Sequence, residues 1–283
     1  IPTYFTYEMT EYVKEEDGIR AVAFRQHVLP HFLEGPVRYL KLRLPAETKR
    51  EVYEKVRSSQ LYDSELSMYK VNEPLAKESY ELGRCRAFTP GWLENESIWL
   101  HMEYKYLLEL LKSGLYQQYI GDLYKAAIPF QDEERYGRSI LENSSFLASS
   151  ANPDESIHGR GFVARLSGST VEFMDMWQRM MFGHTPFREE DDKLVFALQP
   201  VIPSYLLDQE RRVEAVFLGK VRIVYHVDAE DADYIPENYE VVQYCLTGEK
   251  DKEIHIYQNQ IMGEEAENIR AGKYTQIEVW IKK

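Results

Sequence analysis

The chain has 283 residues, of which 44% are hydrophobic and 29% are charged, a composition typical of a folded globular protein rather than a disordered one. Its formal net charge is -13, and because the basic stripe that nucleic-acid binders need is missing, we expect no nucleic-acid partner. No uncharged apolar run is long enough for a membrane helix and no signal-peptide pattern opens the chain, so we expect a cytoplasmic protein without a membrane partner.

The first segment, to about residue 44, is predicted to be strand-like or irregular. The stretch YFTYEMTEYV is aromatic and nearly alternating, and PVRYLKLRL alternates as well, which is the pattern of half-buried strands. A surface helix is predicted from Pro45 to about Gln60, because ETKREVYEKVRSS is charged apart from a stripe of valine and tyrosine.

Two helices are predicted in the middle of the chain. From Leu93 to Lys112 apolar residues recur at helical spacing, with a Pro-Gly pair before the run and a Ser-Gly pair after it. A second helix is predicted from about Tyr116 to Ala127. The very short turn between the two helices predicts an antiparallel helical hairpin.

The character of the chain changes near residue 190. Residues 131–161 are predicted to be a long polar loop, and the segment 169–182 that follows is predicted to be a helix rich in Phe, Met and Trp. Beyond it, KLVFALQPVIP, VEAVFLGKVRIVYHVDA, YEVVQYCLTG, KEIHIYQNQ and YTQIEVWIKK have the pattern of strands. We therefore predict an α+β protein with a domain over residues 1–190 and an antiparallel sheet domain over residues 191–283.

The stretch GWLENESIWLHM is either a capped helix start or one wall of a site. Asn95 is a suitable N-cap, and Glu94 and Glu96 would then lie beside the positive end of the helix dipole. His101 would fall about a turn and a half inside the helix, on a face that it shares with Lys105. If the stretch is only a capped helix start, capping explains its polar residues without a functional site.

Two further stretches contain polar residues that suit ligand binding. RLSGSTVEF offers Ser169 or Thr170 as the cap of the third helix, together with free backbone N–H groups of the kind that hold phosphate. The Ser-rich loop around Glu142 lacks both the spacing of a metal site and the Gly-x-Ser-x-Gly turn of a hydrolase. Because Cys85 and Cys245 lie far apart, we expect neither a disulfide framework nor a zinc site, and no metal.

Taken in order, these stretches resemble a known family. ENESIWLHMEY, the helical hairpin, the Ser-rich loop, RLSGSTVEFMDMW, MFGHTPFREEDDKLVFALQPVIPSYL and VFLGKVRIVYHV are similar to the C-terminal part of the inverting β-glycoside phosphorylases of glycoside hydrolase family 94, the cellobiose phosphorylase and oligo-β-glucan phosphorylase group. The resemblance covers about residues 80–230. It implies the last helices of an (α/α)6 barrel, after the strand-like segment, followed by a C-terminal antiparallel β-sandwich of jelly-roll type.

The resemblance also implies which residues bind phosphate and sugar. The phosphate-binding histidine of the family falls on His101, and the hydroxyl of its SGTA-like motif falls on Ser169, with Thr170 beside it. A further phosphate contact falls in the Ser-rich loop, where we place it at Ser149. The residues expected to contact sugar hydroxyls are Glu94, Asn95 and Glu142.

The implied reaction transfers the terminal glucosyl unit of a β-linked gluco-oligosaccharide to inorganic phosphate with inversion, giving α-glucose 1-phosphate without a cofactor. The family's general acid is an Asp in an upstream Asp-Trp stretch. This sequence has no Asp-Trp pair, so we expect no catalytic residue in this chain. The remaining part of the polypeptide or a companion chain would supply the acid, and since family members are often dimers, a homodimer is a further candidate.

Two alternatives stay open. One is a related enzyme on the same scaffold, either a phosphate-independent β-glucan hydrolase or the phosphorylase-like domain of a glucan synthase. Phosphate dependence of the reaction would distinguish such an enzyme from the phosphorylase. The other is a non-catalytic carbohydrate-binding protein, in which the histidine and the serines are ordinary helix caps.

Overall fold

The structure, a computed structural model, describes residues 1–164, 168–229, 232–248 and 252–283. Its contacts divide the chain into two compact units, Ile1–Met174 and Asp175–Lys283. The division falls within α7 (Gly168–Phe182), N-terminal to residue 190, where the sequence changes character. Helices and mostly antiparallel sheets are both present, so the α+β class predicted from the sequence is confirmed.

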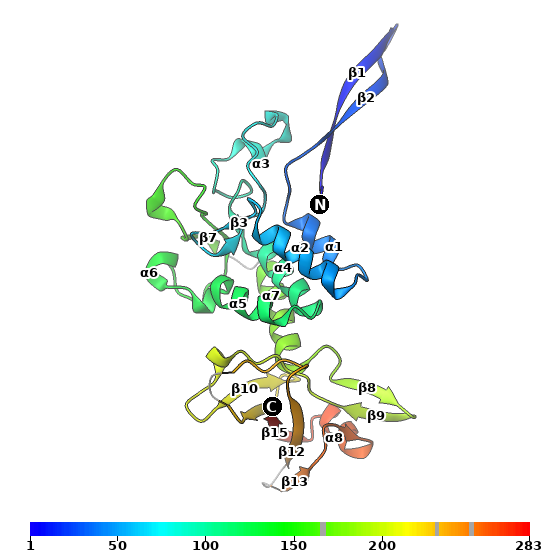
Figure 1. The fold of residues 1–283 in the computed structure, drawn as a ribbon, viewed down its shortest axis with the longest axis vertical. Coiled ribbons are helices and arrows are strands. Elements are labelled where there is room, and N and C mark those ends of the chain that lie inside the picture. The colour runs from blue at the N-terminus through cyan, green and yellow to red at the C-terminus, as the bar shows by residue number, and fades with distance from the viewer. Residues whose placement is uncertain (165–167, 230–231, 249–251) are drawn as a thin grey trace. The chain divides into compact units, whose positions relative to one another are not determined.

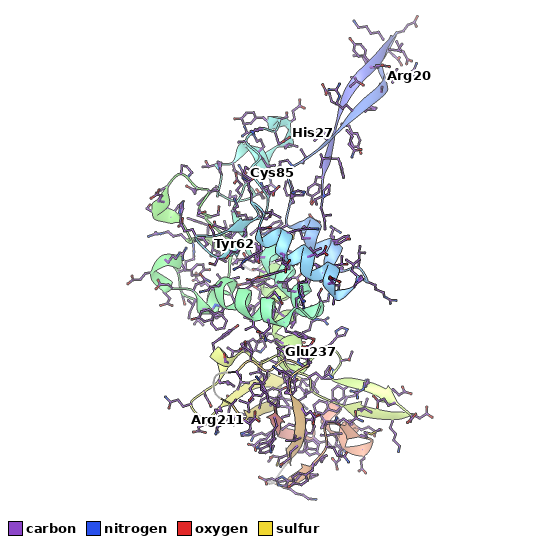
Figure 2. All side chains as sticks on the ribbon, in the orientation of Figure 1. Arg20, His27, Tyr62, Cys85, Arg211 and Glu237 are labelled. Atoms are coloured by element: carbon purple, nitrogen blue, oxygen red, sulfur yellow. The ribbon has the colours of Figure 1, made fainter. Side chains whose placement is uncertain are left out.

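The first unit opens on a two-stranded antiparallel ribbon formed by β1 (Phe5–Glu15) and β2 (Gly18–Val28) (Figure 1). Arg20 lies near its turn and His27 near its base (Figure 2). The strand predicted over YFTYEMTEYV is therefore confirmed.

The helices of the first unit are α1 (Glu34–Leu40), α2 (Ala46–Arg57), α3 (Arg84–Ala87), α4 (Leu100–Lys112), α5 (Tyr116–Ala126), α6 (Glu133–Tyr136) and the first turns of α7. α4 contacts both α1 and α5. Between Leu100 and Leu111 every residue of α4 is buried except His101 and Lys105. A helix that is buried almost all round lies in a core, so α4 is the core helix of this unit and these two residues form its accessible strip.

Small sheets surround these helices. The strands are β3 (Tyr62–Asp63) with β4 (Met68–Tyr69), and β5 (Ile98–Trp99) with β6 (Ser144–Leu147) and β7 (Gly161–Ala164). β5 leads directly into α4, so its pairing with β6 fixes the position at which α4 begins.

Two predictions about this unit are wrong. PVRYLKLRL, predicted as a strand, contains most of α1, because Leu33, Val37 and Leu40 recur at helical spacing and are all buried. The helix predicted from Leu93 begins only at Leu100, since residues 98 and 99 pair with β6, and Asn95 is not its N-cap. The helices predicted over 45–60 and 116–127 are confirmed as α2 and α5.

Among the residues that the structure describes, the second unit contains two sheets. The five-stranded sheet has the order β10 (Arg212–Phe217), β11 (Val221–Val227), β15 (Tyr274–Lys282), β12 (Glu240–Gly248) and β13 (Glu253–Ile256). The three-stranded sheet has the order β14 (Ile261–Met262), β9 (Lys193–Phe196) and β8 (Phe187–Glu190).

Aromatic rings join the two sheets of the second unit. The Phe196 ring of β9 lies 5.8 Å from the Phe217 ring of β10 and 6.1 Å from the Tyr244 ring of β12, centroid to centroid. α8 (Glu264–Arg270) packs on β9, and β15 lies between β11, to which it is parallel, and β12, to which it is antiparallel. Of the helices that the structure describes, none is long and apolar enough to cross a membrane.

Candidate functional site

The accessible strip of α4 lies at the start of the helix. Because β5 ends at Trp99 and α4 begins at Leu100, His101 stands in the first turn of the helix. The predicted position, about a turn and a half inside the helix, is therefore wrong. Lys105 follows one turn later on the same face. The side chains of His101 and Lys105 are 27% and 30% exposed, so both keep access to solvent on an otherwise buried helix.

The N-terminus of α7 meets this strip. A Cβ atom on Gly168 would lie 2.3 Å from Cε1 of His101, so the imidazole lies directly against the glycine backbone. Ser169 follows and is fully buried. One turn along, the Oε1 atom of Glu172 lies 3.6 Å from Nε2 of His101 and 4.0 Å from Nζ of Lys105. We call these five residues the His101 cluster.

The cluster combines hydrogen-bond donors that suit an anion with one carboxylate, Glu172, that opposes an anion. Burial lowers the pKa of His101, and the Lys105 ammonium lowers it further, against the opposing effect of the Glu172 carboxylate. The imidazole is therefore neutral near pH 7, with one N–H to donate. The first backbone N–H groups of α4 and of α7 have no partner within their own helices, and both helix ends carry partial positive charge. Donors of this kind suit an anion.

Aromatic rings line the strands beside the cluster. The Trp99 ring stacks on the Phe146 ring at a centroid distance of 5.9 Å and meets the His101 ring edge-on at 5.8 Å. The Trp92 and Phe162 rings contact each other at 4.2 Å. The Trp99 ring of β5 therefore lies against His101, and a flat apolar ring of this kind suits the C–H face of a sugar.

The residues predicted to contact sugar lie in different surroundings. Glu94 and Glu142 each have an arginine partner outside the cluster, Arg84 at 3.3 Å and Arg138 at 3.1 Å. The Asn95 amide donates to a backbone carbonyl at 2.6 Å. Its Oδ1 atom is buried without a hydrogen-bond partner among the described residues, so it has an acceptor to offer.

The Ser149 hydroxyl ties its loop to the backbone at Glu96. The residue is fully buried, and its hydroxyl donates to the Glu96 carbonyl at 2.5 Å and accepts from the Ala151 N–H at 3.2 Å. The next residue, Ser150, donates its N–H and its hydroxyl to the buried Asp63 carboxylate at 2.8 and 2.9 Å. The Ser149 hydroxyl therefore supports this loop, whereas His101 lies against Gly168, the residue before Ser169.

The sequence reasoning did not assign roles to Lys105 and Glu172. Both were within reach of a spacing argument, because each stands one helical turn after a residue of the quoted motifs, Lys105 after His101 and Glu172 after Gly168. Thr170, the second predicted hydroxyl, is half-buried in the first turn of α7. Residues 165–167, which precede this turn in the RLSGSTVEF stretch, lie outside the described residues.

No protein-family model matches this chain, and no curated protein matches it. A functional assignment therefore depends on the motifs and on the geometry of the His101 cluster.

Proposed function

We propose that this chain is the phosphate-holding part of an inverting β-glycoside phosphorylase, and that the His101 cluster binds inorganic phosphate. The observation that supports this proposal most is the meeting of two helix N-termini, those of α4 and α7, at the partly exposed side chains of His101 and Lys105. An anion held there would receive hydrogen bonds from the imidazole, the ammonium and backbone N–H groups of the two helix starts.

In this proposal, phosphate attacks the anomeric carbon of a terminal β-linked glucosyl unit from the face opposite the leaving oxygen. Phosphate is already negatively charged, so the chain has to hold and orient it rather than deprotonate it. The rings beside His101 would contact the sugar. A carboxylic acid from a segment outside this sequence would protonate the leaving oxygen.

The wider architecture proposed is that of the family. The packing of α4 against α1 and α5 supports the last helices of an (α/α)6 barrel. In the second unit, the ring contacts between the three-stranded and the five-stranded sheets support a β-sandwich.

Glu172 gives the proposal a distinctive test. Its carboxylate contacts both His101 and Lys105, so it stands where the charge of a bound anion would be. Phosphate has to displace this carboxylate or approach beside it against its negative charge. Glu172→Gln should therefore tighten phosphate binding, whereas His101→Asn should weaken it.

The measurement is a phosphate titration of the full chain followed by phosphorus NMR. Loss of one hydrogen bond to a charged ligand, about 1.5–3 kcal/mol, predicts about 10–100-fold weaker binding for His101→Asn. Glu172→Gln should bind several-fold more tightly, and the exposed Glu155→Gln should match the parent chain. Opposite changes at two contacting residues have no explanation in misfolding, and unchanged binding in His101→Asn would exclude the site.

The reaction is tested by adding β-linked gluco-oligosaccharides together with the upstream part of the polypeptide. Formation of α-glucose 1-phosphate supports the phosphorylase. Release of glucose without phosphate consumption would instead identify a hydrolase on the same scaffold.

A further inference from the structure

Three potential metal ligands lie close together at the β12–β13 edge of the five-stranded sheet. β12 and β13 pair antiparallel with Cys245 directly opposite His255. Glu253 stands two residues before His255 on the same strand, and side chains two residues apart in a strand lie on the same face. The thiol, the imidazole and the carboxylate therefore project from one face of two paired strands.

The distances among these groups fit a tetrahedral zinc ion. The Sγ atom of Cys245 lies 3.9 Å from Nε2 of His255, and that nitrogen lies 3.3 Å from Oε2 of Glu253. All three ligand atoms lie within 4.8 Å of one another. Zinc bonds of about 2.3 Å to sulfur and about 2.0–2.1 Å to nitrogen and oxygen, at tetrahedral angles, would separate S from N by about 3.6 Å and N from O by about 3.3 Å.

We propose that Cys245, His255 and Glu253 form a binding site for a thiophilic divalent cation of the zinc class. A thiolate and an imidazole favour zinc over magnesium or calcium, which prefer oxygen ligands alone. Cys245 is buried while His255 and Glu253 are exposed, so the sulfur forms the floor of the site and solvent supplies the fourth ligand.

Neighbouring side chains support this assignment. The Gln243 amide lies 3.3 Å from Nδ1 of His255, the ring nitrogen that the metal would leave free. A metal-bound histidine usually donates that N–H to an oxygen, and the oxygen and nitrogen of an amide exchange places by a flip. Glu278 stands opposite Cys245 on β15 and adds negative charge that attracts a cation.

The proposed cation would fasten the edge of the sheet. β13 is the last strand in the order β10-β11-β15-β12-β13, and it is only four residues long. Bonds from one metal to Cys245 on β12 and to His255 and Glu253 on β13 would cross-link the edge strand to its neighbour. This role concerns the second unit and is independent of phosphate binding at His101.

The test is a titration of the full chain with Co²⁺, which reports a thiolate ligand by a charge-transfer absorption that zinc then abolishes by displacement. One equivalent of Co²⁺ is expected to bind. Cys245→Ser should abolish the absorption, whereas the matched control Cys85→Ser, which changes the cysteine in α3 (Figure 2), should retain it.

Two further variants keep the test decisive if Cys245→Ser disturbs the sheet. His255→Gln and Glu253→Gln change exposed side chains, and each is expected to weaken Co²⁺ binding at least about tenfold while the chain stays folded. Absence of the absorption in the parent chain, its survival in Cys245→Ser, its loss in Cys85→Ser, or unchanged affinity in both glutamine variants would each overturn the proposal.

Discussion

Gly168 has no side chain, and this leaves the space that the His101 ring occupies in the candidate phosphate site. The imidazole of His101 occupies the space into which any side chain at residue 168 would project. Gly168→Ala is therefore expected to displace the ring or the first turn of α7, to cost about 1–3 kcal/mol of stability, and to weaken phosphate binding. Urea unfolding and the phosphate titration measure the two effects.

The matched control is Gly121→Ala in α5, where an added Cβ would meet no atom within 4 Å. Alanine in a helix interior is favoured over glycine by about 0.5–1 kcal/mol, so this variant should be more stable than the parent chain. Equal effects of the two substitutions would contradict the tight contact at His101.

Some of these residues were predictable and others were not. The motifs singled out His101 and Ser169, and the structure places His101 against Gly168, the neighbour of Ser169 at the start of α7. The pairing of Cys245 with His255 was not visible in the sequence, because it depends on the register of β12 on β13. Cysteine spacing alone says nothing about a histidine on the neighbouring strand.

At the scale of elements, α4 carries a buried acid inside the core. Glu103 is fully buried, its Oε1 accepts from the Tyr69 N–H at 3.2 Å, and its Oε2 has no hydrogen-bond partner among the described residues. Burial raises the pKa of Glu103 well above the ordinary value, and the charges of Asp122 and Asp63 act in the same direction. The folded chain thus keeps a proton that the unfolded chain loses.

Because Glu103 is protonated more readily in the folded chain, the free energy of unfolding is expected to fall as pH rises. The stabilising contribution of the protonated Glu103 is fully present below the ordinary glutamate pKa and is lost as pH rises toward the folded-state pKa, at about 1.4 kcal/mol per pH unit. Glu103→Gln cannot ionise, so its stability relative to the parent chain should improve by this amount per pH unit over that window. Urea midpoints measured from pH 4 upward give the slope, and the exposed Glu54→Gln should keep the parent slope.

Elements were predictable where the apolar period was clear. α2 and α5 have a single apolar stripe, and the strand-rich C-terminal part alternates. α1 was missed because seven residues offer too little periodicity against an alternating background. The start of α4 was misplaced because the pairing of Trp99 with Phe146 is a contact between distant segments, which overrides local helix signals.

At the scale of the whole molecule, the α+β class was predictable, whereas the order of strands was not. β15 pairs with both β11 and β12, so it joins the two halves of the five-stranded sheet. A chain ending at Lys273 would lack this strand and is expected to lose the ordered second unit, while the first unit keeps its core. Limited proteolysis with mass spectrometry should then show cleavage confined to residues after 174. Protection of β10 to β13 in the shortened chain would contradict this expectation.

The central place of β15 also bears on how the protein emerges from the ribosome. β11 leaves the ribosome well before β15, and at about 5–20 residues per second the translation of the intervening segment takes seconds. During that interval the edge of β11, and later that of the newly made β12, has open backbone groups and apolar side chains but no partner strand to pair with. The nascent second unit therefore passes through a period of exposure to aggregation that ends only when residues 274–282 have been made.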